Sequence, residues 1–181
     1  MNIILCGLPM CGKSTLGPMI AQKLGKIFID TDHELEKAYA KAVGETLSCR
    51  EISIRLGEPA FRRWENFVIA GIQGITNSII ATGGGSLCDH ETAQILKSLG
   101  TLVYLQVPSK VLIQRLMQKS ALPSYLNPLD PIGSFEELSK YRCQLYEKFA
   151  DTRIDASSTD LEEVLSRICS SIEIERAYGQ Q

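Results

Sequence analysis

The chain has 181 residues, a length typical of one domain. Its apolar fraction of 44% and charged fraction of 22% are ordinary for a globular protein. The formal net charge of -2 argues against binding to nucleic acid or to an acidic membrane. Six cysteines without a C-x-x-C pair favour free thiols in a reducing compartment, and no segment reaches the roughly 20 apolar residues of a membrane span. We therefore expect a cytoplasmic protein.

Short apolar runs alternate with helical patterns along the chain. Strands are predicted at residues 2–6, 27–29, 78–81, 102–107 and 152–155. Helices are predicted at residues 13–24, 34–42, 52–56, 59–75, 109–118, 135–149 and 161–174. Residues 119–133 hold three prolines and few periodic apolar residues, and 176–181 are predicted as a frayed tail.

Strands that alternate with helices indicate an α/β fold, with three layers (α/β/α) around a parallel sheet of five strands. We expect a single domain over residues 1–181. Within it, residues 32–76 form a helical region without a strand, and residues 119–133 form a long loop of the kind that acts as a mobile lid.

Residues 7–14 match the phosphate-binding pattern G-x-x-x-x-G-K-[ST]. A predicted strand ends at Gly7 and a predicted helix begins at Lys13, so backbone N–H groups and the helix N-terminus would face an anion. Lys13 would then lie near the β- and γ-phosphates of ATP, and the Ser14 hydroxyl would ligate Mg²⁺. The alternative, an ordinary glycine-rich turn, is disfavoured by this context. The loop predicts an ATP-binding phosphotransferase of the P-loop kinase type.

Asp30 and Asp32 follow the second predicted strand. Ligands of open α/β sheets bind at the carboxyl ends of strands, so these carboxylates could serve a metal ion and a substrate hydroxyl. Capping of the next helix by Asp30 or Thr31 explains the same residues equally well, and both interpretations remain open.

Two further segments carry candidate binding residues. Arg62 and Glu65 are three residues apart on a predicted helix; the segment alone favours a solvated ion pair over an arginine fork for a substrate carboxylate. The run Gly83, Gly84 and Gly85 has a high entropic cost on folding, which favours close approach of the backbone to a ligand.

Together these motifs resemble the shikimate kinase family, part of the nucleoside-monophosphate-kinase-like P-loop group, over about residues 3–168. The resemblance rests on residues 7–15, 28–32, 57–65, 81–85, 103–105, 141–146 and 150–155, in the order and spacing of the family. It implies a monomer that transfers phosphate from ATP, with Mg²⁺, to the 3-hydroxyl of shikimate in chorismate biosynthesis.

The resemblance also implies roles for individual residues. The phosphate-binding positions are Gly7, Pro9, Met10, Cys11, Gly12, Lys13, Ser14 and Thr15. Lys13 and Asp32 match the catalytic positions, Asp32 binding the substrate hydroxyl and acting as its base, while Ser14 matches the direct Mg²⁺ ligand and Asp30 the residue that reaches the metal through water. Arg62 and Arg142 match the pair that holds the shikimate carboxylate, and Gly83, Gly84 and Gly85 the backbone that contacts substrate. Arg115 matches the arginine that packs on adenine.

The sequence departs from the family pattern in the lid. The family carries Arg-Pro-Leu-Leu there, whereas this chain has Leu122 at the arginine position. We hypothesise that Lys119 substitutes for the missing charge, in which case Lys119→Ala lowers kcat far more than it raises KM. Ser53 replaces an aromatic residue of the substrate pocket.

Two other functions remain open at this stage. One is a related small-metabolite kinase, acting on gluconate or a nucleoside monophosphate, which the two arginines and the three glycines disfavour. The other is a nucleotide-binding regulatory protein that has lost catalysis, which Leu122 favours.

Overall fold

The computed structural model describes residues 1–118 and 122–178, with side chains as far as Ile172. Its sheet has five parallel strands in the order β2-β3-β1-β4-β5. The strands are β1 (Asn2–Cys6), β2 (Ile27–Asp30), β3 (Ser78–Ala81), β4 (Gly100–Gln106) and β5 (Thr152–Asp155). The helices are α1 (Lys13–Leu24), α2 (Thr31–Val43), α3 (Cys49–Leu56), α4 (Glu58–Gly71), α5 (His90–Leu99), α6 (Ser109–Met117), α7 (Pro131–Phe149) and α8 (Leu161–Tyr178), with a short 3₁₀ turn at Ser86–Cys88.

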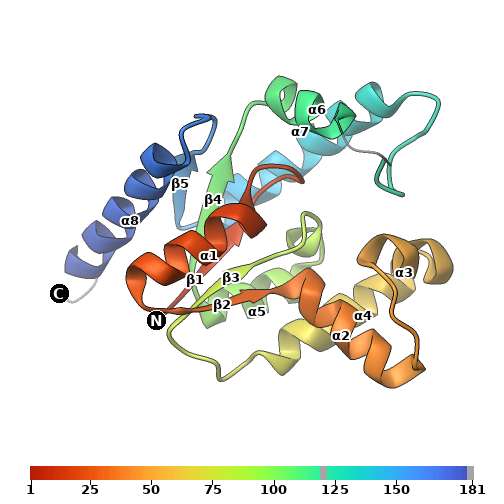
Figure 1. The fold of residues 1–181 in the computed structure, drawn as a ribbon, viewed down its shortest axis with the longest axis horizontal. Coiled ribbons are helices and arrows are strands. Elements are labelled where there is room, and N and C mark those ends of the chain that lie inside the picture. The colour runs from red at the N-terminus through yellow and green to blue at the C-terminus, as the bar shows by residue number, and fades with distance from the viewer. Residues whose placement is uncertain (119–121, 179–181) are drawn as a thin grey trace.

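Helices cover both faces of the sheet, as the three-layer prediction requires (Figure 1). Helices α1 and α8 lie on one face and α5 and α7 on the other. The central strand β1 is buried throughout, which explains its almost wholly apolar sequence. Helices α2, α3 and α4 form a separate group beside the sheet, around a small core of their own made by Leu35, Tyr39, Ile52 and Val68.

Parallel pairing brings the ends of three strands together. Leu5 pairs with Ala81, and Ala81 pairs with Asp30, so β1, β3 and β2 finish side by side. The segments that follow them are residues 7–14, the Thr82–Gly85 turn and the start of α2. These are the segments that the sequence singled out, and the sheet places them at one edge.

All the predicted strands and helices are found, but several boundaries were wrong. Helix α3 begins three residues early because Ser48 and Glu51 form a capping box, and α7 begins at Pro131 because Asp130 caps it. Helix α4 ends at Gly71 rather than at 75, and α8 continues into the predicted tail as far as Tyr178. Helix α5 was missed. No helix in the described part of the chain is long and apolar enough to cross a membrane.

Asn2 joins the amino ends of three strands. Its side chain is 2% exposed, and its Nδ2 donates to the carbonyls of Ile75 (2.7 Å) and Leu99 (3.0 Å). Its Oδ1 accepts from the backbone N–H (3.1 Å) and the hydroxyl (3.0 Å) of Ser78. One amide therefore satisfies buried polar groups just before β3 and β4, at the end of the sheet opposite the site.

Replacing Asn2 by alanine should lower the free energy of unfolding by about 2–4 kcal/mol, since each buried backbone group left without a partner costs roughly 1–3 kcal/mol. Urea denaturation measures the effect. Asn127→Ala is the matched control, because Asn127 is exposed and accepts one local hydrogen bond from Leu129; it should change stability by less than about 0.5 kcal/mol. Equal stability of the two variants would contradict the role given to Asn2.

Candidate active site

A cavity of about 790 Å³ opens at the carboxyl edge of the sheet, between residues 9–15, α3, α4, the glycine turn and the lid segment. The predicted site residues that line it are Pro9, Met10, Gly12, Lys13, Ser14, Thr15, Asp32, Arg62, Gly83, Gly84, Gly85 and Arg142. The other predicted site residues, Gly7, Cys11, Asp30 and Arg115, are each hydrogen-bonded to a lining residue. The cavity therefore collects the residues that were predicted from separate motifs.

The phosphate loop is held in an unusual backbone conformation around Lys13. Gly12 has a φ of 103° and Met10 a φ of 68°, in the left-handed region. The buried Lys13 ammonium donates to the carbonyls of Gly7 (2.8 Å) and Leu8 (3.0 Å). Arg115 of α6 donates to the Met10 carbonyl at 2.9 Å, which ties α6 to the loop. The loop thus encloses a positive charge at the start of α1, which suits a polyphosphate.

Asp30 is the cap of α2, which was one of the two interpretations that the sequence left open, and its second oxygen is bonded to Ser14. Its Oδ1 accepts the backbone N–H of Asp32 at 3.0 Å and caps α2, while its Oδ2 accepts the Ser14 hydroxyl at 2.6 Å. A hydroxyl and a carboxylate oxygen side by side are ligands that Mg²⁺ prefers. The described residues contain no cluster of three or more His, Cys, Asp or Glu that could hold a metal alone. This set suits Mg²⁺, which is bound in phosphate-transfer sites largely by water and phosphate.

Asp32 faces the cavity in a strongly acidic setting. Burial first, and then the nearby charges of Asp30 and Glu65, raise the pKa of this carboxyl from 3.8 to about 6. Lys13 opposes the shift. A carboxyl with a pKa near 6 is ionised at neutral pH and still basic enough to accept a proton, which suits a general base.

Glu65 is buried and Arg62 is partly buried, so the prediction of a solvated ion pair was wrong. Glu65 is 5% exposed, bonds Arg62 closely and accepts the Ser86 hydroxyl at 3.2 Å. Arg62 also contacts Glu58 at 3.1 Å. Packing of α4 against the Ser86 turn removes this pair from water, which helix spacing alone cannot reveal.

The glycine turn is packed against site side chains. A Cβ on Gly83 would lie 2.8 Å from the Glu65 carboxylate, one on Gly84 would lie 2.9 Å from the Pro9 ring, and one on Gly85 would overlap the Arg62 guanidinium. Any side chain here would therefore push a site residue out of place. Close approach of site side chains therefore accounts for the three glycines, and the predicted approach of this backbone to a ligand stays a prediction.

Arg142 reaches the same turn from α7. Its Nη1 donates to the Gly84 carbonyl at 3.0 Å, which also accepts the Tyr146 hydroxyl at 2.5 Å. The Arg142 guanidinium lies 5.2 Å from the ring centroid of Tyr125, which belongs to the lid segment. Arg62 and Arg142, 80 residues apart, thus meet around Gly84 and Gly85 as the predicted pair.

A family model described as shikimate kinase matches residues 9–173. The chain is similar to the shikimate kinase of Thermodesulfovibrio yellowstonii, at 35% identity over 95% of each chain, and to that of Corynebacterium jeikeium, at 34% identity over 94% of this chain and 87% of the other. The chain belongs to the shikimate kinase family.

Solved structures of shikimate kinases have the same fold. The enzyme from Acinetobacter baumannii, in complex with shikimate, superposes with a TM-score of 0.85 at 28% identity, covering 96% of this chain and 93% of the other. The enzyme from Aquifex aeolicus gives a TM-score of 0.79 at 33% identity over 99% of each chain. The α/β fold expected from the resemblance is confirmed.

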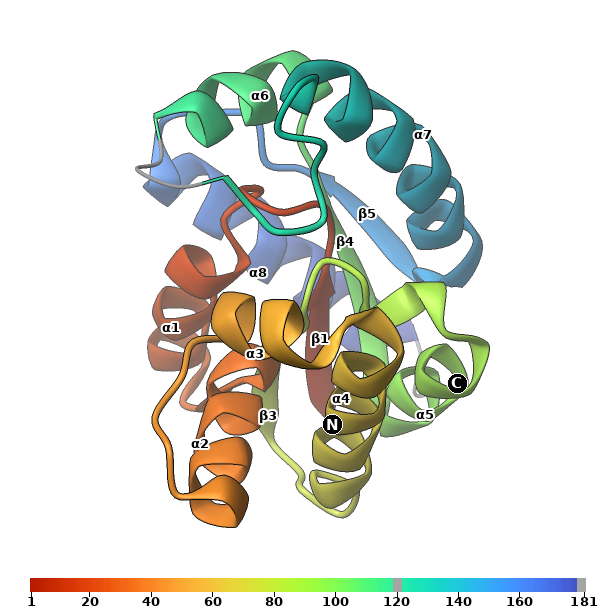
Figure 2. The same cartoon turned by 90° about the vertical axis from the view of Figure 1, so that its right-hand side faces the viewer.

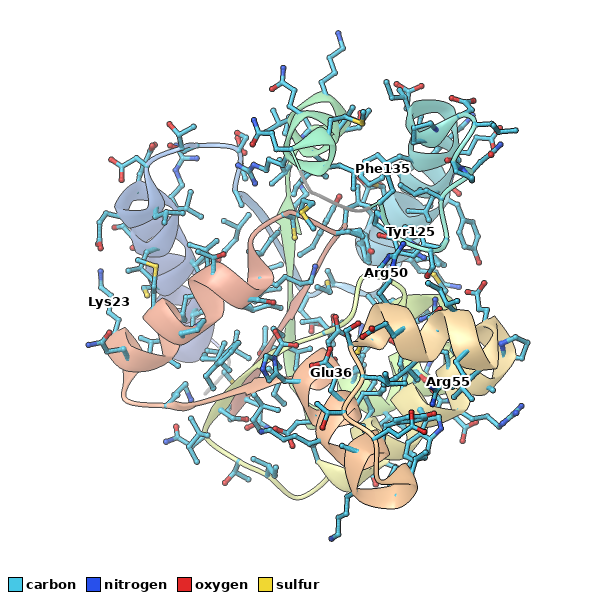
Figure 3. The ribbon with its side chains drawn as sticks, turned by 45° about the vertical axis from the view of Figure 1, so that its right-hand side comes forward. Lys23, Glu36, Arg50, Arg55, Tyr125 and Phe135 are labelled. Atoms are coloured by element: carbon cyan, nitrogen blue, oxygen red, sulfur yellow. The ribbon has the colours of Figure 1, made fainter. Side chains whose placement is uncertain are left out.

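The lid segment of this shikimate kinase family member contacts the substrate-side helices. Leu122 packs on the main hydrophobic core, its carbonyl accepts from Arg50 Nε at 2.9 Å, and Ser124 contacts Ser53 of α3 across 3.5 Å. Figure 3 shows Arg50 beside Tyr125, between α3 and the lid. Lys119, the predicted substitute for the lid arginine, lies outside the described residues.

Arg50 and Tyr125 are among the cavity residues that the sequence analysis did not single out. Both lie outside the motifs that carry the family resemblance, so their positions depend on how the lid meets α3. One signal in the sequence pointed to them. Position 122 lacks the family's arginine and position 53 lacks its aromatic residue, so an arginine and an aromatic residue from other segments could take their places.

Asp32→Asn should raise the free energy of unfolding at pH 7.5 by about 1–2 kcal/mol, because folding costs free energy whenever it raises the pKa of an ionised carboxyl. The folded protein binds this proton more tightly than the unfolded chain between about pH 4 and 6, so the wild type loses stability as the pH rises through that window. Below pH 4 the two proteins should be about equally stable. Urea denaturation at both pH values measures the difference, and a less stable variant at pH 7.5 would contradict it.

Proposed function

We propose that this protein transfers the γ-phosphoryl group of ATP to the 3-hydroxyl of shikimate. The observation that carries the proposal is the order of groups along one cavity: the phosphate loop, then Asp32, then the two arginines around the glycine turn. A ring acid with a carboxylate and neighbouring hydroxyls complements that order. The 33–35% identity to shikimate kinases over nearly the whole chain supports the same assignment.

The reaction needs placement and charge more than covalent chemistry. Asp32 accepts the proton of the attacking hydroxyl as the new O–P bond forms, and the bond from the γ-phosphorus to the bridging oxygen breaks, so that ADP leaves with its electron pair. Lys13 neutralises charge on the phosphates. The planar guanidinium groups of Arg62 and Arg142 hold the substrate carboxylate through paired N–H donors, which orients the shikimate ring.

We assign the metal position to Ser14 and Asp30, and the metal to Mg²⁺. When bound, the ion supplies charge neutralisation to the β- and γ-phosphates. The Ser14 hydroxyl can donate to Asp30 and still offer a lone pair to the ion. Arg115, fixed on the Met10 carbonyl, is assigned to the adenine side.

The enzyme is further proposed to act as a monomer in the cytoplasm. The cavity is formed by residues of a single chain, and all six cysteines are free thiols, as expected in a reducing compartment.

Release of ADP from ATP and Mg²⁺ should depend on shikimate and reach a turnover typical of kinases, roughly 1–100 s⁻¹. A coupled assay for ADP, with and without shikimate, measures it. Asp32→Asn should lower kcat by about 10²–10⁴-fold, the usual contribution of a general base. Stimulation by gluconate or a nucleoside monophosphate in place of shikimate would assign a different acceptor. Tight ATP binding without ADP release in the presence of any of these acceptors would indicate a nucleotide-binding protein that has lost catalysis.

Tyr125→Ala should raise KM for shikimate by about 2- to 5-fold while leaving KM for ATP unchanged, because the ring lies over the carboxylate-binding Arg142 and such a contact at an exposed site is worth roughly 0.5–1 kcal/mol. Steady-state kinetics with each substrate varied measures it. Tyr141→Ala, at an exposed position beside Arg142 in sequence, is the control and should behave as wild type. A rise in KM for ATP would place Tyr125 on the wrong side of the cavity.

A further inference from the structure

Among the residues that the structure describes, four cationic side chains line the cavity, and three of them are already bound at its two ends. Lys13 donates to carbonyls of the phosphate loop, Arg62 pairs with Glu65, and Arg142 bonds the Gly84 carbonyl. The fourth is Arg50, the second residue of α3, which also lines the cavity. The chain between α6 and α7 passes over α3 at this side (Figure 2).

The base of Arg50 is fixed. The Ser48–Glu51 capping box closes the first turn of α3, with the Ser48 N–H donating to Glu51 at 2.8 Å. The N–H of Cys49 donates to Glu36 of α2 at 2.8 Å, which anchors the same turn to the next helix. The guanidinium therefore extends from a rigid backbone.

The far end of Arg50 is aimed by the lid. Its Nε donates to the Leu122 carbonyl at 2.9 Å, and Leu122 is itself held by its side chain in the core. Within the described residues, no hydrogen bond from the two terminal amino groups of Arg50 is found. Those groups form the pair of donors that binds phosphate oxygens most strongly.

Position 122 is also where the lid lacks a charge. An arginine side chain at that position would start from the same piece of backbone that Arg50 contacts, so the Arg50 guanidinium lies next to the point from which the missing cation would extend. The transition state of phosphoryl transfer carries negative charge on the transferred group. The described lid residues that line the cavity are Pro123, Ser124 and Tyr125, and none of them carries a positive charge.

We propose that Arg50 supplies this charge: its terminal amino groups contact the transferred phosphoryl group, and α3 thereby provides the cation that the lid does not. The inference rests on the proposed function. Arg50 moves no proton and forms no bond; it stabilises charge that is greater in the transition state than in the ground state.

The test compares Arg50→Ala with Arg55→Ala. Arg55 lies on the same helix, is paired with Glu45 at 2.6 Å, does not line the cavity and points away from it in Figure 3. Arg50→Ala should lower kcat by at least about 100-fold with KM for shikimate and ATP changed less than about threefold, the pattern of an interaction made only in the transition state. Arg55→Ala should stay within about twofold of wild type, since exposed ion pairs contribute little.

Rescue separates a charge from a structural contact. In the double variant Arg50→Ala/Leu122→Arg, an arginine returns from the lid while the bond to the Leu122 carbonyl stays lost. Recovery of kcat to within about tenfold of wild type is expected, and Arg50→Lys should keep an intermediate kcat.

Three results would overturn the inference in an enzyme whose wild type is active on shikimate. The first is an unchanged kcat in Arg50→Ala, which would leave Lys119 as the candidate for the missing lid charge. The second is a rise in KM for shikimate alone, which would make Arg50 a ground-state contact. The third is a loss of kcat in Arg50→Ala that Leu122→Arg does not restore. A wild type that releases no ADP with shikimate would instead overturn the proposed function, and this inference with it.

Discussion

Glu65 carries a carboxylate that is almost wholly removed from water, and a buried charge of this kind is stable only when it is paired and hydrogen-bonded. Its partners are Arg62 on the same helix and the Ser86 hydroxyl beyond the glycine turn. Satisfying Glu65 therefore fixes α4 against that turn and aims Arg62 at the cavity. The same charge helps to keep the Asp32 proton affinity high, so one buried group shapes both the carboxylate-binding end and the base.

The charges of the cavity are segregated along its length. Acidic residues gather around Asp32, and basic residues stand at the two ends and at the α3 side. A polyphosphate at one end and a carboxylate at the other would each meet cations, while the reacting hydroxyl would meet the carboxylate between them. Electrostatics alone thus orients both substrates along the cavity before any close contact forms.

Much of this site was predictable because it depends on local signals. The phosphate loop is a contiguous motif, and the three strand ends carry Gly7, Asp30 and Thr82 as short apolar runs give way to glycine or polar residues. Parallel pairing then brings these ends together without further information. Helix α5 was missed because its buried face holds only Thr92, Ala93 and Leu96, too narrow a stripe for a clear helical period.

The parts that sequence did not reveal depend on contacts between distant segments. Burial of Glu65 depends on the Ser86 turn, 21 residues away in sequence. Asp30 both caps α2 and bonds Ser14, because its two oxygens face different neighbours. Arg50 and Tyr125 depend on where the lid segment lies over α3, which no single-segment pattern encodes.

The stacking of Tyr125 on Arg142 has a consequence for inhibition. In this chain a lid aromatic, rather than a side chain at position 53 of α3, forms one wall of the carboxylate end of the cavity. A ligand held there is covered by a residue that belongs to a loop, so its escape requires that loop to give way. Compounds that fill the space beside Ser53 should be selective for this chain over relatives that have an aromatic residue at position 53. Compounds that also stack under Tyr125 should have a long residence time, because their dissociation rate is set by the loop as well as by their own contacts.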